Sequence, residues 1–169
     1  MERVREQAGF EYFLRKIPFS KLPQAAITGR VMILNASHYG IDALVFDAAH
    51  QIKHIPLPDI DIVTLHGLSA DIILQQPENT TEAQLKSYTK RYLNPALWTV
   101  WNDIVAPIFD QIVISSKGHG VVPQDQIWWY PTGPLTFNPI HAAGPRRDVD
   151  VSCLVISSYV TTLDSLFQA

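Results

Sequence analysis

The most constraining stretch of the chain is an aromatic run that is followed at once by a proline- and glycine-rich turn. Residues 127–130 have the bulky, aromatic composition of a buried strand. Pro131, Gly133 and Pro134 then predict a tight turn, because proline fixes φ and glycine readily takes a positive φ. The apolar residues within 135–140 predict a second extended segment. This part of the chain is therefore expected to form a strand, a rigid turn and a strand.

A long helical region is expected between this aromatic run and the N-terminal third. Asn79 and Glu82 have the spacing of a capping box. Asn94 and Pro95 predict a helix that restarts, with asparagine as N-cap and proline in the first turn, and Pro107 predicts a kink near Asp103. The apolar residues expected on one side, wide enough to cover a sheet, are Leu85, Tyr88, Tyr92, Leu93, Leu97, Trp98, Trp101, Ile104, Val105, Ile108 and Ile112.

Several further segments have the composition of strands. Residues 31–34 and 41–46 are apolar runs separated by turn-forming residues, which predicts a hairpin with a longer loop. Residues 52–57 alternate and end among prolines, which predicts a third, edge strand. Residues 60–65 fit either a strand or an extended lead-in, and residues 153–158 predict a last strand. Strands that alternate with helical patterns indicate the α/β class, with helices packed on a sheet.

Composition limits the class of protein. A chain of 169 residues with 47% hydrophobic and 17% charged residues is expected to fold as one core-rich domain. The net charge of −3 gives no electrostatic signature of nucleic acid or membrane binding. One cysteine excludes an internal disulfide, and the charged N-terminus does not read as a signal peptide. No run reaches the roughly 18 apolar residues of a membrane span. A cytoplasmic location is the expectation.

The aromatic run belongs to a longer string, 127–144, that ends in His-Ala-Ala-Gly. Two other stretches, 9–22 near the start and 157–163 near the end, carry related patterns. Together they resemble the CHAT family, the caspase-like domains that often follow TPR repeats, and most closely its fungal members. The resemblance covers nearly the whole chain.

The resemblance implies a particular fold. It is an α/β arrangement with an N-terminal β-meander, a helical crossover and the first strands of a caspase-like three-layer sheet, incomplete. Residues 1–30 are then a helical lead-in, with helices near 2–16 and 19–26, and residues 31–169 are the N-terminal part of a CHAT domain. A loop at 115–124 and a helix starting near 161–167 complete the expectation. A TPR-repeat context upstream is implied as well.

The catalytic residues of that family have fixed positions relative to the aromatic strand, and the histidines and the cysteine of this chain can be compared with them. The family places its histidine in a His-Gly pair and its cysteine in a Ser-Ala-Cys-like context, both after the aromatic strand. Here the two His-Gly pairs, at His66 and His119, precede that strand, and the single cysteine, Cys153, opens its expected strand. A histidine that closes a parallel strand would lie at the opposite end of the sheet. We therefore expect no catalytic residue in this chain, with the family's dyad lying beyond residue 169.

The remaining polar residues suggest no other chemistry. His50 and His54 are four apart, a metal-ligand spacing only on a helix, and the nearby prolines disfavour a helix. His38 is expected to be exposed in the hairpin turn, and His141 either orders the second hairpin or lines a cleft. Scattered carboxylates are expected as solvated caps: Asp42, Asp47, Asp59, Asp61 and Asp71. Trp128 and Trp129 point to opposite faces of a strand and are expected to be buried under helices on both sides. No metal and no cofactor is expected.

Three functions remain open at this point. The first is an incomplete CHAT domain, inactive as it stands, from a TPR-containing signalling or cell-death protein. The second is a stand-alone protein-interaction module that uses the same fold as a scaffold. The third, least favoured, is a hydrolase using His66 and Cys153. The outer edge of strand 153–158 distinguishes the first two functions. A bare, apolar edge indicates an incomplete domain and is expected to cause self-association. A blunted or paired edge indicates a self-sufficient module.

Overall fold

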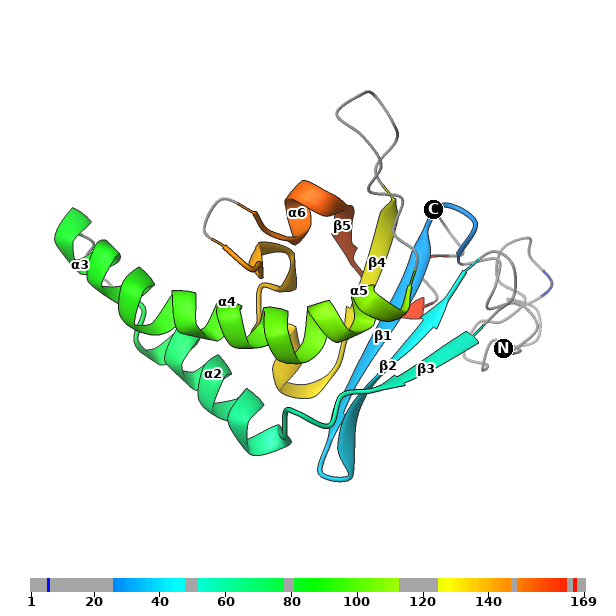
Figure 1. The fold of residues 1–169 in the computed structure, drawn as a ribbon, viewed down its shortest axis with the longest axis horizontal. Coiled ribbons are helices and arrows are strands. Elements are labelled where there is room, and N and C mark those ends of the chain that lie inside the picture. Colours follow the sequence, from blue (N-terminus) through cyan, green and yellow to red (C-terminus); the bar gives the residue numbers. More distant parts are fainter. Residues whose placement is uncertain are drawn as a thin grey trace.

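The centre of the molecule is a five-stranded mixed sheet in the order β3-β2-β1-β4-β5 (Figure 1). The computed structural model describes residues 6, 26–47, 52–77, 81–112, 125–146, 149–163 and 166. The strands are β1 (Arg30–Ser37), β2 (Gly40–Phe46), β3 (Ile52–Pro56), β4 (Gln126–Pro131) and β5 (Ile156–Tyr159). Helices complete the fold, so the α/β class expected from the sequence is confirmed.

The first three strands form the predicted meander. β1 pairs with β2 and β2 with β3, all antiparallel, and β3 is an edge strand as expected. The loop between β1 and β2 is shorter than predicted. Ser37 pairs with Gly40, so only His38 and Tyr39 make the turn. The strands continue to the tip because the Ser37 hydroxyl donates to the Gly40 carbonyl and orders the turn.

The second half of the sheet is parallel. β1 pairs with β4 and β4 with β5, both parallel, and the predicted aromatic strand is confirmed as β4. Parallel neighbours require a crossover connection. The helices between β3 and β4 supply the first crossover, from the meander to β4, and a shorter segment of helical turns between β4 and β5 supplies the second.

Residues 60–65 were expected to be extended, and this is wrong. They contain the start of α2 (Ile62–Leu74), in which the Asp61 carboxylate accepts a hydrogen bond from the Thr64 amide at 2.7 Å. This bond lowers the pKa of Asp61. The strand-like composition of Ile62 and Val63 is overridden because Leu65 packs into the core and Ser69 bonds to the segment after β4.

Residues 82–111 form one continuous helical rod (Figure 1) made of α3 (Glu82–Tyr88), α4 (Asn94–Val100) and α5 (Ala106–Gln111). Its capping box is Thr81 with Gln84, so the prediction of Asn79 with Glu82 is wrong by two residues. The rod continues without the predicted restart at Asn94.

The rod contains two π-helical segments, Thr89–Leu93 and Trp101–Val105. Each segment is followed by one residue and then by a proline. The amide of Asn94 donates to the Thr89 carbonyl, and the amide of Ala106 donates to the Trp101 carbonyl, both five residues back. A wider turn makes room for the rings of Pro95 and Pro107, which lack the amide of a normal helical turn. The irregularity predicted near Asp103 is therefore a π-helical turn.

The segment after β4 differs most from the sequence prediction. The second strand of the expected hairpin is replaced by two 3₁₀ turns, η4 (Gly133–Phe137) and η5 (Ile140–Ala142). Gly133 has φ +57° and Pro134 lies at the start of the first turn directly after it, so the chain curls instead of extending. Cys153 does not open a strand either. It lies in the short helix α6 (Val151–Leu154), which Asp150 caps, and β5 begins only at Ile156.

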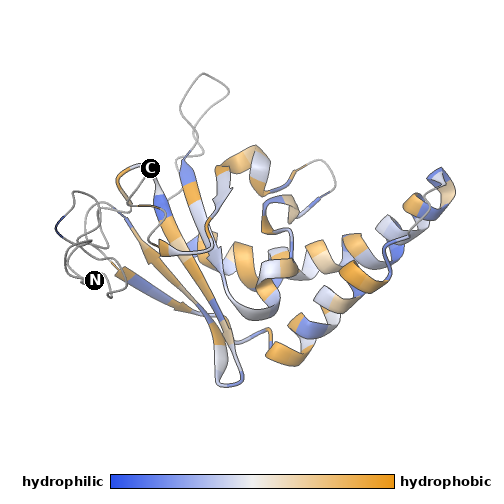
Figure 2. Ribbon diagram, turned by 180° about the vertical axis from the view of Figure 1, so that it is seen from behind, coloured by the Kyte–Doolittle hydropathy of each residue, from blue (hydrophilic) through white to orange (hydrophobic). Residues whose placement is uncertain are grey.

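The main core lies between the sheet and the helices. It joins alternate residues of the strands to α2, the rod, η4, η5 and α6, as the hydropathy colouring of Figure 2 illustrates. Its largest fully buried members are Trp129, Met32, Leu34, Ile55, Leu57, Leu65, Ile104, Ile108, Ile127, Leu135 and Ile140. The opposite face of the sheet carries a smaller cluster, against which Trp128 packs half-buried. The two tryptophans do point to opposite faces, but only Trp129 is fully buried.

Some predictions fall outside the described residues. These are the helix near 2–16, most of the helix near 19–26, the loop at 115–124 and much of the helix near 161–167. His50 and His119 fall there too. Within the part of the chain that the structure describes, no helix is both long and apolar enough to cross a bilayer.

Candidate functional site

A hollow of about 640 Å³ lies at the carboxyl ends of the parallel strands β1 and β4. This is the edge of an α/β sheet at which ligands usually bind. We call it the α2 groove, because one side of it is a face of α2. Its lining residues are Ala36, Ser37, His38, Ile62, His66, Ser69, Ala70, Ile73, Leu74, Gly133, Pro134 and Phe137.

The string 127–144 forms the wall of this groove that lies opposite α2. The Thr132 amide donates to the Leu34 carbonyl at 2.9 Å, and the Thr132 hydroxyl accepts from the Ala36 amide at 3.1 Å. Gly133 follows so closely that a Cβ there would stand 3.3 Å from the Ala36 carbonyl oxygen. The turn predicted from Pro131, Gly133 and Pro134 is therefore real, and its role is to hold the groove wall against β1.

A buried polar network fixes α2 to that wall. The Asn138 amide nitrogen donates to the Ser69 hydroxyl and to the Pro134 carbonyl, both at 2.9 Å. The Ser69 hydroxyl lies 2.9 Å from the carbonyl oxygens of both Leu65 and Pro134. The Pro134 oxygen can only accept, so it fixes which way the Asn138 amide is turned. The other amide atom, Asn138 Oδ1, is buried and has no hydrogen-bond partner among the described residues.

The described histidines lie at three locations. His38, in the β1–β2 turn, and His66, on α2, both line the α2 groove and are exposed. His141 lies near the carboxyl end of β5, where its ring nitrogen Nδ1 is 3.0 Å from the Tyr159 hydroxyl and its amide donates to the same oxygen. Burial raises the pKa of Tyr159, so its hydroxyl stays protonated and can donate to His141. His54 lies on β3, where its ring nitrogen Nε2 is 3.7 Å from Oδ1 of Asp42.

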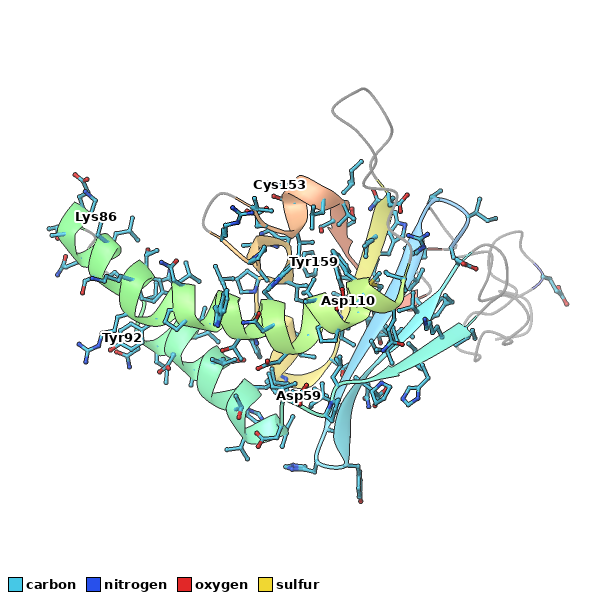
Figure 3. The ribbon with its side chains drawn as sticks, viewed as in Figure 1. Asp59, Lys86, Tyr92, Asp110, Cys153 and Tyr159 are labelled. Atoms are coloured by element: carbon cyan, nitrogen blue, oxygen red, sulfur yellow. The ribbon has the colours of Figure 1, made fainter. Side chains whose placement is uncertain are left out.

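Cys153 lies on α6, before β5, and does not line the α2 groove that holds His38 and His66. His141 lies in η5, which packs against α6, and its ring bonds to Tyr159 at the carboxyl end of β5 (Cys153 and Tyr159 are labelled in Figure 3). The Cys153 thiol is exposed and hydrogen-bonds to the Asp150 carboxylate, a bond that contributes to the lowered pKa of Asp150 after the larger effect of Ser152. A carboxylate neighbour is the reverse of the electropositive surroundings that activate a nucleophilic cysteine.

The carboxylates fulfil structural roles, as far as the described residues show. Asp61 caps α2, and Asp42 accepts from the Asn35 side chain at 3.2 Å. Asp103, in the second π-helical segment, has its pKa raised mainly by burial and also by the charge of Asp59. In the described ranges, no three His, Cys, Asp or Glu side chains gather as metal ligands.

The sequence identified some of these residues without their grouping. His38, His66 and His141 were each singled out, but nothing local indicated that the first two share a groove. Ser69 and Asn138 were missed. The sequence contains little signal for them, because each lies in a segment that contains other polar residues as well.

Comparison with known proteins adds no relative. No family model, no curated protein and no solved structure matches this chain.

Proposed function

We propose that this chain forms the N-terminal portion of a CHAT-type, caspase-like domain and acts by binding a protein partner, not through a catalytic residue of its own. The order of a β-meander, a helical crossover, an aromatic strand and a further parallel strand supports this proposal. The resemblance of the 127–144 string to the fungal CHAT domains supplies the family. A signalling or cell-death protein with TPR repeats is the proposed context.

Two observations carry the non-catalytic part: Cys153 has the Asp150 carboxylate as its neighbour, and it lies outside the α2 groove that His38 and His66 line. Cysteine catalysis requires the imidazole within hydrogen-bond reach of the sulfur. Cys153 lies before β5, next to Asp150, while His38 and His66 line the groove at the carboxyl ends of β1 and β4, and the His141 ring bonds to Tyr159. The hydrolase that pairs His66 with Cys153 is therefore not supported.

A labelling experiment tests this assignment. A cysteine-directed peptidase inhibitor should react with Cys153 no faster than expected for an ordinary exposed thiol, and iodoacetamide should confirm that the thiol is accessible. His66→Ala and His141→Ala should leave both rates unchanged. Mass spectrometry of the labelled peptide measures each rate. A rate that falls at least tenfold in either histidine variant would overturn the proposal.

The two edges of the sheet indicate which surface takes the partner. β3 carries Lys53, His54 and Pro56, residues that protect an edge from pairing. β5 carries Ile156 and Tyr159, both partly exposed, and has neither a charge nor a proline. Its inner edge pairs with β4, and no other described strand pairs with its outer edge. We propose the outer edge of β5 as the surface that adds a strand from a partner or a second copy.

Self-association through β5 is the expected result for the isolated chain. Light scattering across a concentration series should show dimers or larger species. Ile156→Lys should shift the protein toward the monomer, because a lysine on the edge disfavours strand pairing. Ile52→Lys, at the opposite edge, is the matched control and should leave the distribution unchanged. A wild-type protein that stays a monodisperse monomer would count against the β5 surface while leaving the labelling result intact.

A further inference from the structure

The α2 groove has the dimensions of a site for a small molecule. Its volume of about 640 Å³ lies within the roughly 300–1,000 Å³ of typical ligand pockets. One wall is the face of α2 that runs from Ile62 to Leu74, and the other is made by the β1–β2 turn and by η4. This hollow has no part in the binding surface proposed on β5.

The groove is held in shape before any ligand arrives. The network of Ser69, Asn138 and Pro134 ties α2 to η4, and Thr132 ties the start of η4 to β1. A ligand that enters a preformed pocket avoids most of the entropic cost of ordering its walls. The hollow is therefore suited to bind without a conformational change.

The lining of the groove is mainly apolar. Ile73, Leu74 and Phe137 are 48%, 74% and 58% exposed, a high value for large apolar side chains that line one hollow. Covering this surface would remove apolar area from water, which is favourable. The ligand should therefore have a substantial hydrocarbon part.

The polar groups of the lining indicate the chemistry of the ligand's other, polar end. The hydroxyls of Ser37 and Ser69 already donate to backbone carbonyls. The two imidazoles, His38 and His66, are the titratable side chains of the lining, which contains no carboxylate, lysine or arginine. An imidazole donates to an acceptor and, when protonated, pairs with an anion. We propose that the α2 groove binds a small amphipathic carboxylate of the fatty-acid type, with its chain along α2 and its carboxylate at His38 and His66.

A small molecule fits this site better than an extended peptide. Peptides that bind beside a sheet gain affinity from main-chain hydrogen bonds to an open strand edge. The strand that reaches the groove, β1, is paired on both sides, with β2 and with β4. An apolar peptide that occupies the groove through its side chains alone is the competing outcome.

The test uses dodecanoate, below its micelle-forming concentration, with the whole chain. Isothermal titration calorimetry should show saturable binding of one molecule per chain. Dodecyltrimethylammonium, with the same chain length and the opposite charge, should bind at least tenfold more weakly. The double variant His38→Ala with His66→Ala should lower the affinity for dodecanoate about tenfold or more, since hydrogen bonds to a charged group are lost. Its affinity for uncharged dodecanol should change much less.

A blocking variant and its control locate the binding. Ala70→Trp places a large ring in the groove from an exposed position on α2 and should abolish binding. Val63→Trp, on the same helix at a residue that is 75% exposed and does not line the groove, should bind as the wild type does. Circular dichroism and thermal unfolding must show that both variants fold.

Three results would each overturn the proposal. They are the absence of saturable binding of dodecanoate, an equal affinity for the ammonium amphiphile, and binding that survives Ala70→Trp. Saturable binding of an apolar peptide together with no binding of dodecanoate would assign the groove to a protein segment instead. All of these outcomes are independent of the labelling and light-scattering results, so each proposal can fail by itself.

Discussion

Replacing Trp129 with alanine should lower the free energy of unfolding by about 3–5 kcal/mol, the range typical of large aromatic side chains removed from a core. Trp129 is fully buried on β4, the strand that lies between β1 and β5. Its ring stacks on Phe109 of α5 at a centroid distance of 6.4 Å, and its indole nitrogen donates to the Ser157 hydroxyl at 3.0 Å. The substitution would remove one of the contacts between the sheet and the helical rod, and it would also leave Ser157 without that donor.

The adjacent Trp128 provides a matched control. It points to the other face, is half-buried, and donates to the Thr28 hydroxyl at 3.2 Å. Trp128→Ala should therefore cost only about 1–2 kcal/mol, because a side chain in partial contact with water loses less on removal.

Urea unfolding at one fixed protein concentration measures both values, and the fixed concentration matters because self-association would add apparent stability. Equal losses for the two variants would show that the helices do not bury one face of β4 in preference to the other.

The sheet was predictable because the apolar runs that indicate its strands are local sequence patterns. Apolar runs at 31–34 and 41–46, and the aromatic run before Pro131, correspond to β1, β2 and β4. Bulky and β-branched side chains suit a pleated, half-buried surface whatever their tertiary neighbours are. The same reasoning failed for α2. Ile62 and Val63 have strand composition, but the Asp61 cap and the burial of Leu65 decide the helix, and burial depends on partners far along the chain.

The prediction for the region after β4 was wrong for a related reason. Leu135 and Phe137 alternate as a strand would, yet Leu135 is buried while Phe137 is exposed in a 3₁₀ turn. The positive φ of Gly133 and the buried amide of Asn138 decide that conformation, since the Asn138 amide must reach both Pro134 and Ser69. Sequence spacing gives no indication of a bond between residues 69 and 138.

The candidate site was the least predictable part. The groove is assembled from the β1–β2 turn, α2 and η4, which are separated by dozens of residues in the chain. His38 and His66 were visible as individual residues, but their shared surroundings follow only from the parallel pairing of β1 with β4 and from the helical state of residues 62–74. A sequence that is read as a strand at 60–65 places His66 at a strand end and removes the groove altogether.

The Asn138→Asp variant should lose about 3 kcal/mol or more of stability at pH 7. The side chain of Asn138 is only 2% exposed, and both of its amide hydrogen bonds run from nitrogen to oxygen acceptors. A carboxylate in the same place would lose these donors, face the Pro134 carbonyl and bury a charge.

The pH dependence of this loss distinguishes charge from shape. Burial raises the pKa of the introduced carboxyl in the folded state above its unfolded value of about 3.9, because it disfavours the charged form. The folded variant then binds a proton more tightly than the unfolded chain. Its deficit relative to the wild type should therefore grow as the pH rises through the interval between these two pKa values, and should shrink as the pH falls through it. Asn138→Ala, which cannot titrate, should show a deficit that does not change with pH. Urea unfolding of both variants and the wild type between pH 4 and pH 8 measures these differences. A deficit of the aspartate variant that is small, or that stays constant over this range, would mean that water reaches Asn138 and that α2 is not fixed to the groove wall by a buried network.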